Sequence, residues 1–171
     1  MRALPAFGRF DLVTCLDDAL NHLLEPDDVV RTFEGMAANL DPAGRIVFDV
    51  TTMATYRGGR TEFLELGERV IVMRDGEAVI DRAGDATQLT VELFRRTPIG
   101  LWRRTTSSHG HRHYPLAQIQ SLLAAAGLEA VAIRGQRRGG RLVAEPDEGR
   151  HHKLVVVAAR TREEDSMRYG P

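Results

Sequence analysis

Hydrophobic and polar positions follow different spacings in three parts of the chain, and the first part predicts a strand, a helix and a second strand. Residues 10–15 are almost continuously apolar, which is typical of a parallel strand covered on both faces. In residues 27–40 apolar side chains recur at steps of three and four, which predicts a helix with one buried face. Residues 41–44, Asp-Pro-Ala-Gly, are typical of a turn, and the apolar residues 45–50 predict the next strand. Short links between these elements predict a parallel pair with a right-handed crossover.

The middle of the chain, residues 63–113, has the pattern of antiparallel strands with turns between them. Asp75-Gly76 is a strong hairpin signal. The strands that we expect cover residues 69–73, 78–82, 88–95 and 101–114. No helical spacing interrupts them, so this segment predicts a small β-sheet inserted into an α/β fold.

Helical spacing returns in residues 116–126, and Gly127 is a typical helix end. Strands are predicted at residues 128–133 and 153–159, and the second is so apolar that we expect neighbours on both of its sides. The fold class is therefore α/β with an antiparallel insertion. We divide the chain into a core (residues 1–55 and 114–160), the β insertion (residues 56–113) and a charged tail that we expect to be disordered (residues 161–171).

Composition narrows the classes of partner. The 171 residues are 43% hydrophobic and 27% charged with a formal net charge of -1, which is ordinary for one globular domain. Near-neutral charge argues against nucleic acid as a partner, because phosphate binding leaves a basic footprint. No apolar run reaches the ~20 residues that span a membrane, so we expect no membrane partner. The single cysteine, Cys15, has no partner for an internal disulfide, and we therefore expect a cytoplasmic protein.

Carboxylates follow two neighbouring predicted strands. Asp17 and Asp18 come after the first strand, and Asp49 lies at the end of the second. In an open α/β sheet ligands bind at the carboxyl ends of the strands, so these residues are candidates for a ligand site. Helix N-capping is the alternative interpretation for Asp17 and Asp18, and capping of a turn is the alternative for Asp49.

Histidines gather at the end of the β insertion. In a strand His109, His111 and His113 share one face, and this arrangement makes them candidate metal ligands. A single strand with flanking glycine and no nearby cysteine or acid is a weak ligand set, and we expect no metal here.

Three stretches together carry a resemblance to a known family. They are residues 10–23 (FDLVTCLDDALNHL), residues 40–50 (LDPAGRIVFDV) and residues 111–131 (HRHYPLAQIQSLLAAAGLEAV). In this order, with a β insertion between the second and the third, they resemble the C-terminal part of a class I S-adenosylmethionine (SAM)-dependent methyltransferase of the small-molecule type. The resemblance implies a Rossmann-like sheet, of which this chain holds strands four to seven, and an antiparallel lid. It implies SAM as cofactor and an O or N atom of a small molecule as methyl acceptor.

The family's glycine-rich acidic loop, E/D-x-G-x-G-x-G, is missing from the sequence. The acids that hold the SAM ribose and adenine in the family are missing too, and Met1-Arg2 resembles an internal stretch of family members. We therefore expect an N-terminally truncated enzyme that is inactive by itself. The alternative is a non-catalytic α/β fragment or partner-binding module without SAM binding. The sequence leaves a homodimer open.

The resemblance also implies roles for single residues. His109, Arg112 and Tyr114 match an H-x-x-R-x-Y pattern of lid-bearing relatives, in which His109 is the candidate general base. A polar place on a surface helix is the alternative for His22, and packing of the next helix is that for Tyr114. The residues implied to bind SAM are Cys15, Leu16, Asp17 and Asp18, and those implied to bind substrate are Asn21, His22, Asp49, Arg112 and Tyr114.

Overall fold

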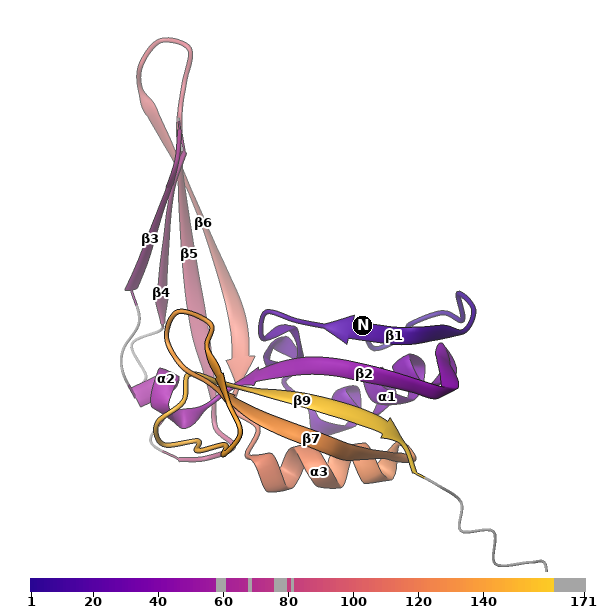
Figure 1. The fold of residues 1–171 in the computed structure, drawn as a ribbon. Helices are drawn as coiled ribbons and strands as arrows, with labels where there is room; N and C mark the ends of the chain where they lie inside the picture. Colours follow the sequence, from indigo (N-terminus) through magenta and orange to yellow (C-terminus); the bar gives the residue numbers. More distant parts are fainter. Residues whose placement is uncertain (58–60, 68, 76–79, 81, 162–171) are drawn as a thin grey trace, which may run out of the picture.

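The described strands form two β-sheets, and one stands upright on the end of the other (Figure 1). The computed structural model describes residues 1–57, 61–67, 69–75, 80 and 82–161. The core sheet has the strand order β1 (Phe10–Cys15), β2 (Leu40–Thr51), β9 (Lys153–Arg160), β7 (Leu128–Gln136) and β8 (Leu142–Val143). The second sheet, which we call the lid, has the order β3 (Thr61–Leu66), β4 (Arg69–Asp75), β5 (Ala86–Arg96) and β6 (Trp102–Arg112).

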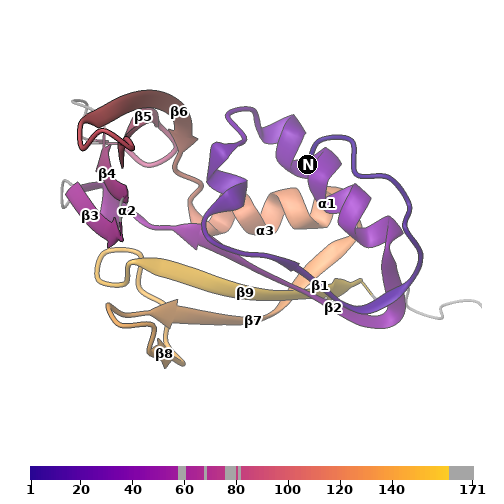
Figure 2. The same cartoon turned by 90° about the horizontal axis from the view of Figure 1, so that it is seen from above.

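The core sheet confirms the predicted parallel pair and the central place of the last strand. β1 runs parallel to β2, and β9 lies between β2 and β7, antiparallel to both. Helices α1 (Pro26–Ala38) and α3 (Leu116–Ala125) lie on the same face of this sheet (Figure 2). Their apolar stripes meet the strands there, and Phe33 packs on Phe48 with ring centroids 5.2 Å apart. The two helices therefore fix the orientation of the core strands.

The turn predicted at residues 41–44 is absent as a separate element, because β2 begins at Leu40 and runs through it. The pairing with β1 jumps from Phe10↔Leu40 to Leu12↔Arg45, so the extra residues form an irregularity inside the strand. The Asp41 carboxylate accepts a hydrogen bond from the Ala43 N–H at 3.0 Å and stabilises this irregularity. The turn-forming sequence is thus absorbed by a bulge.

The lid differs from the predicted strand set in two ways. The sequence pattern did not predict strand β3 or the short helix α2 (Met53–Arg57) that precedes it. The prediction of a strand at residues 78–82 is also wrong, because Ile80 and residues 82–84 do not belong to a strand. Ile80 is instead buried against Met53 and Tyr56, which explains its apolar character. Gly76 of the predicted hairpin, residues 78, 79 and 81, and the tail from residue 162 onward lie outside the described residues.

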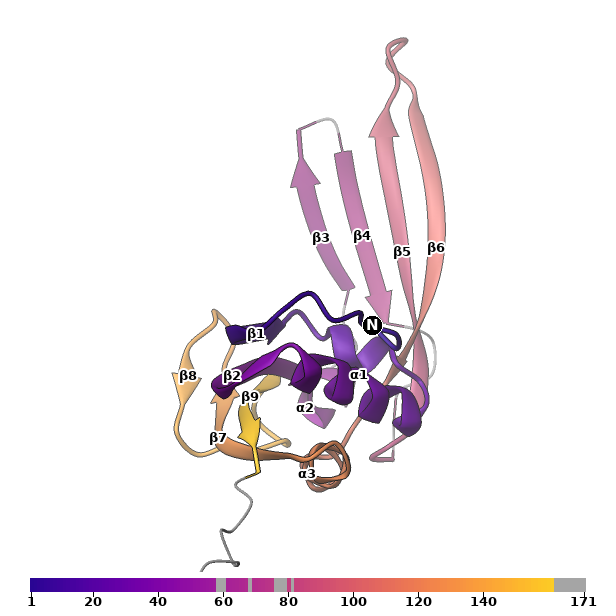
Figure 3. The same cartoon turned by 90° about the vertical axis from the view of Figure 1, so that its right-hand side faces the viewer.

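The long β5–β6 ladder connects the lid to the core. It pairs residues from Arg96↔Trp102 at the outer end to Ala86↔Arg112 at the inner end, so His111 of β6 arrives beside the turn at the carboxyl end of β1. Figure 3 shows the lid rising above the core sheet. Among the described residues, every helix is too short or too polar to cross a membrane.

Candidate functional site

The chain makes a sharp turn directly after β1. Asp17 and Asp18 both have left-handed backbone angles, with φ of 62° and 49°. This conformation is costly for residues other than glycine, and Asp is among those that tolerate it. The Asp49 carboxylate holds the turn, because it accepts hydrogen bonds from the N–H of Asp17 at 3.0 Å and of Asp18 at 2.5 Å. Asp49 thus has the turn-capping role that the sequence left as an alternative.

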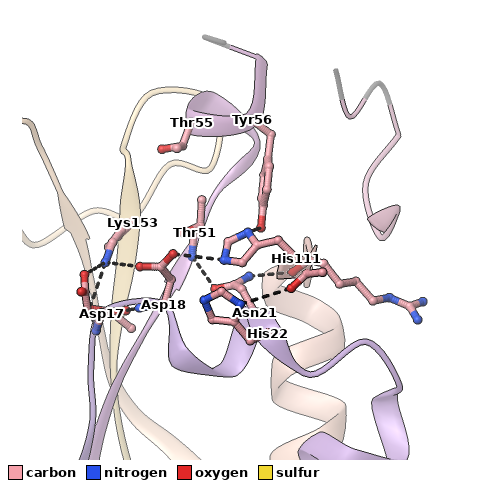
Figure 4. Close-up of polar contacts among 12 residues, drawn as sticks. Asp17, Asp18, Asn21, His22, Thr51, Thr55, Tyr56, His111 and Lys153 are labelled. Carbon is pink, nitrogen blue, oxygen red and sulfur yellow. Dashed lines mark hydrogen bonds and ion pairs between the residues drawn. The ribbon is translucent and has the colours of Figure 1, made fainter. Parts of the chain in front are cut away.

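Lys153, the first residue of β9, offsets part of the negative charge at this turn. Its Nζ lies 2.8 Å from Asp18 Oδ1, 3.1 Å from Asp17 Oδ1 and 3.5 Å from Asp49 Oδ2 (Figure 4). Burial lowers the pKa of Lys153, but the hydrogen bond to Asp18 and the surrounding carboxylates outweigh it and raise the pKa above its usual range. Lys153 is therefore a fixed cation at neutral pH.

Asp18 connects this lysine to the lid. Asp18 occupies the N-cap position of the short 3-10 turn that follows, but its side chain makes no capping hydrogen bond. One oxygen faces Lys153, and the other lies 3.1 Å from Nε2 of His111. Burial raises the pKa of Asp18, but the contacts with His111 and Lys153 outweigh it and hold the pKa well below its usual range. The carboxylate is therefore ionised at neutral pH.

His111 is buried at the inner end of β6, with 7% of its side chain exposed. Its Nδ1 lies 2.7 Å from the hydroxyl of Tyr56 on α2. Its Nε2 is near Asp18, yet no partner among the described residues lies in the direction of a hydrogen bond to it. The exposed His22 packs edge-on against the His111 ring at 4.8 Å, and its Nδ1 lies 3.2 Å from the Gly110 carbonyl oxygen.

Asn21 ties the core to the lid. It belongs to the 3-10 turn η1 (Ala19–His22) and is fully buried. Its side-chain oxygen accepts a hydrogen bond from the Thr51 N–H at 3.0 Å, and its amide nitrogen donates to the Arg112 carbonyl at 2.7 Å. With both polar ends engaged in this way, Asn21 fixes how η1, β2 and β6 meet.

Arg112 and Tyr114 hold the segment that follows η1. The Arg112 guanidinium donates to the carbonyl oxygens of Leu24 at 2.6 Å and Gly84 at 3.0 Å. The Tyr114 hydroxyl donates to the Leu23 carbonyl at 2.5 Å, and burial raises the pKa of Tyr114 to about 12. Both side chains therefore contact backbone at the lid–core junction, as in the packing alternative for Tyr114. Their part in substrate binding stays a prediction.

The other predicted residues lie around this junction. The Cys15 side chain is buried at the end of β1, whereas the Leu16 and Asp17 side chains are exposed. His109 is exposed on the lid, with its ring 6.1 Å from His22 and its Nε2 3.1 Å from Ser107 Oγ. Its role as general base stays a prediction.

Lys153 and the individual role of His111 were not predicted from the sequence. A weak signal existed for each: Lys153 is the lone cation that opens an otherwise apolar strand, and His111 is the middle one of three alternating histidines. Neither signal points to Asp18, because the sequence positions are far apart. Their proximity depends on the strand order.

No protein-family model and no curated protein match the chain, but solved structures do. An S-adenosylmethionine-dependent methyltransferase from Clostridium acetobutylicum has a TM-score of 0.72 at 17% identity, covering 93% of this chain and 61% of that one. The amino pentose methyltransferase CalS10 from Micromonospora echinaspora has a TM-score of 0.62 at 22% identity, covering 94% and 62%. The sugar N-methyltransferase KedS8 from Streptoalloteichus has a TM-score of 0.63 at 21% identity, covering 94% and 60%.

These likenesses confirm the predicted fold. The chain has a Rossmann-like fold of the class I SAM-dependent methyltransferase type with an antiparallel insertion. It spans about three fifths of the length of the structures that it matches.

Proposed function

We propose that this chain forms the acceptor side of a SAM-dependent methyltransferase that methylates an N or O atom of a small molecule. The observation that carries the proposal is the position of the cluster around Asp18. The turn of Asp17 and Asp18 follows β1, the strand after which the family resemblance puts SAM, and the inner end of the lid meets it there through His111. A cofactor-side turn and a lid-side polar group thus lie in direct contact.

The residues of the turn fit one wall of a SAM site. When bound, SAM supplies a methyl carbon made electrophilic by a sulfonium. Asp17, Asp18 and Asp49 outnumber the single ammonium of Lys153, and this excess negative charge complements the sulfonium and ammonium charges of SAM. The exposed Leu16 adds apolar surface beside the turn. Since the 171 residues lack the E/D-x-G-x-G-x-G loop, we propose that residues outside this sequence make the contacts to the methionine part.

On the acceptor side, the chain's contribution is orientation of the nucleophile. Methyl transfer is an in-line displacement, so holding the acceptor atom in place and keeping water out supply much of the rate. Asp18 offers a charge that attracts an ammonium, and His22 and His111 offer ring nitrogens at the same place. The matched structures include an amino pentose and a sugar N-methyltransferase, so amino sugars are the first acceptor class to test.

Two measurements test the proposal. Calorimetry with SAM is done on the 171-residue chain and on the longer polypeptide obtained by extending the reading frame upstream, and radiolabelled methyl transfer to amino sugars is measured with both. We expect undetectable or very weak SAM binding by the short chain, and binding with transfer by the longer one. An extended chain that neither binds SAM nor transfers methyl overturns the proposal. Micromolar SAM binding by the short chain overturns only the proposal that residues outside the 171-residue sequence contact the methionine part of SAM.

A partner-binding module is the second candidate, and the edge of the core sheet favours it. Among the described residues β1 pairs with β2 alone, and Phe10 and Leu12 on it are 46% and 55% exposed. An apolar strand edge of this kind invites pairing with another chain. Sedimentation equilibrium of the 171-residue chain tests this directly, since it also detects the homodimer that the sequence leaves open. A monomer at all concentrations removes the homodimer.

A further inference from the structure

We propose that Asp18, His22 and His111 form a binding site for a divalent transition metal of the zinc class. The three residues come from the turn after β1, from η1 and from β6, so the site joins the core to the lid (Figure 4). The expectation of no metal rested on β6 alone, where no acid lies near the histidines in sequence. The fold brings Asp18 to His111 and adds His22 beside both of them.

The distances fit a metal after a small side-chain adjustment. One ligand atom from each residue lies within 4.8 Å of the other two. Zinc binds nitrogen and oxygen at about 2.0–2.2 Å, which places tetrahedral ligands about 3.4 Å apart. Nε2 of His111 and Oδ2 of Asp18 are already 3.1 Å apart. His22 lies at the exposed side of the site, where a small shift of its ring closes the remaining gap.

His111 carries the strongest sign of a missing ligand. Its Nε2 is buried and has no directed hydrogen bond among the described residues, although the carboxylate of Asp18 is close. If Nε2 bears a proton, that N–H is poorly directed at the carboxylate; if it does not, a lone pair faces a carboxylate oxygen. The second state is unfavourable for a buried polar atom, and a cation between the two atoms satisfies both of them.

The remaining ring nitrogens are held as they are in metal sites. Histidine ligands usually bind the metal with one nitrogen while the other contacts a carbonyl or another polar group of the protein. His22 Nδ1 lies 3.2 Å from the Gly110 carbonyl oxygen, and His111 Nδ1 lies 2.7 Å from the Tyr56 hydroxyl. Both contacts leave the ε nitrogens as ligand atoms.

The charge around the site favours a dication. The carboxylates of Asp17, Asp18 and Asp49 surround the single ammonium of Lys153, which leaves an excess of two negative charges. Lys153 contacts Oδ1 of Asp18, so the other oxygen stays available to a metal. A divalent cation is attracted by this excess, the same negative charge on which the proposed SAM site draws.

Two imidazoles and one carboxylate suit zinc and its neighbours in the first transition row better than magnesium or calcium, which prefer oxygen ligands. Three protein ligands leave coordination positions for an outside molecule. A hydroxyl of an amino sugar would occupy one of them and leave the neighbouring amine, with its lone pair free, as the nucleophile. This use of the site rests on the proposed function, whereas metal binding itself does not.

Metal binding is tested on tag-free 171-residue protein after removal of metal with a chelator. Zinc is titrated by calorimetry, and cobalt(II) is titrated by its visible absorption, which reports tetrahedral coordination. We expect one equivalent to bind. His22→Ala is the main variant, because His22 is exposed and its loss leaves the fold intact, and His111→Gln is the second. Each variant removes a direct ligand, so zinc affinity should fall by more than about tenfold, which is the smallest loss expected when a residue that only supports a ligand is removed.

His109→Ala is the matched control, since His109 lies two residues from His111 on the same strand and outside the cluster. It should bind zinc like the wild type, and circular dichroism checks the fold of each variant. No binding by the wild type, or equal binding by wild type and His22→Ala, overturns the proposal. The assay uses no SAM, so a protein that binds zinc at these residues but transfers no methyl group refutes the proposed function and leaves this inference in place.

Discussion

Replacement of Lys153 by methionine tests the electrostatic account of the turn after β1. Methionine keeps an unbranched apolar stem and removes the ammonium. Asp18 and Asp49 are 21% and 10% exposed and lose their cation, whereas Asp17 is 97% exposed and is screened by solvent. Breaking a buried ion pair costs about 3–5 kcal/mol. Because Asp49 keeps two backbone hydrogen bonds, we expect a loss of about 2–3 kcal/mol in the free energy of unfolding.

The assay is urea denaturation at pH 7 and at pH 4. With a slope of about 2 kcal/mol per molar urea, the loss lowers the midpoint by roughly 1–1.5 M. In the wild type the pKa of Asp18 is below that of the unfolded chain, so its contribution is present above the unfolded pKa and is lost only at lower pH. Without Lys153, the Asp18 carboxylate loses one of the two contacts that lower its pKa, so its pKa rises while His111 still opposes part of the rise. Protonation of Asp18 toward pH 4 then offsets part of the loss, and the difference in stability from wild type should shrink there.

Two control variants sharpen the Lys153 experiment. Lys153→Arg keeps the charge and should lose less stability than Lys153→Met. Asp17→Asn removes the exposed carboxylate and should change stability by no more than about 0.5 kcal/mol. A Lys153→Met loss below about 1 kcal/mol, or one that is equal at pH 7 and pH 4, contradicts the reasoning.

Three further predictions concern other parts of the chain. A Cβ at Gly135 would clash with the imidazole ring of His151, so Gly135→Ala should lower the free energy of unfolding by about 1–3 kcal/mol, measured by thermal denaturation. Gly149→Ala, whose Cβ would meet its nearest atom at 3.3 Å, should cost much less. Burial raises the pKa of the Cys15 thiol to about 11, so the native protein should react with a thiol reagent at pH 8 far more slowly than the unfolded one; equal rates would contradict this. In a SAM-binding form, His109→Ala should lower turnover more than SAM affinity, and the reverse would remove its role as base.

The fold was predictable from the sequence where the residues of a segment determine the structure of that same segment. β1 has the bounds that its apolar run indicates, and β9 is paired on both sides as its composition requires. The prediction that β1 is covered on both faces is wrong, because among the described residues it ends the sheet and most of its side chains are exposed. The predictions failed where the structure of a segment depends on packing against residues that are distant in the sequence. Residues 41–44 have a turn sequence but join β2 because β1 accommodates a bulge, and Ile80 is apolar because it packs under α2 and not because it is in a strand.

The candidate site was predictable on its core side and not on its lid side, and the reason is the sequence separation of its parts. Asp49 lies at the end of a predicted strand, so its place beside the turn of Asp17 and Asp18 follows from two adjacent parallel strands. Lys153 reaches the same turn from 135 residues away because β9 returns antiparallel to β2. His111 reaches it because the β5–β6 ladder ends at η1. The sequence supplies the charges, but only the order of the strands makes Asp18 the carboxylate that both Lys153 and His111 contact.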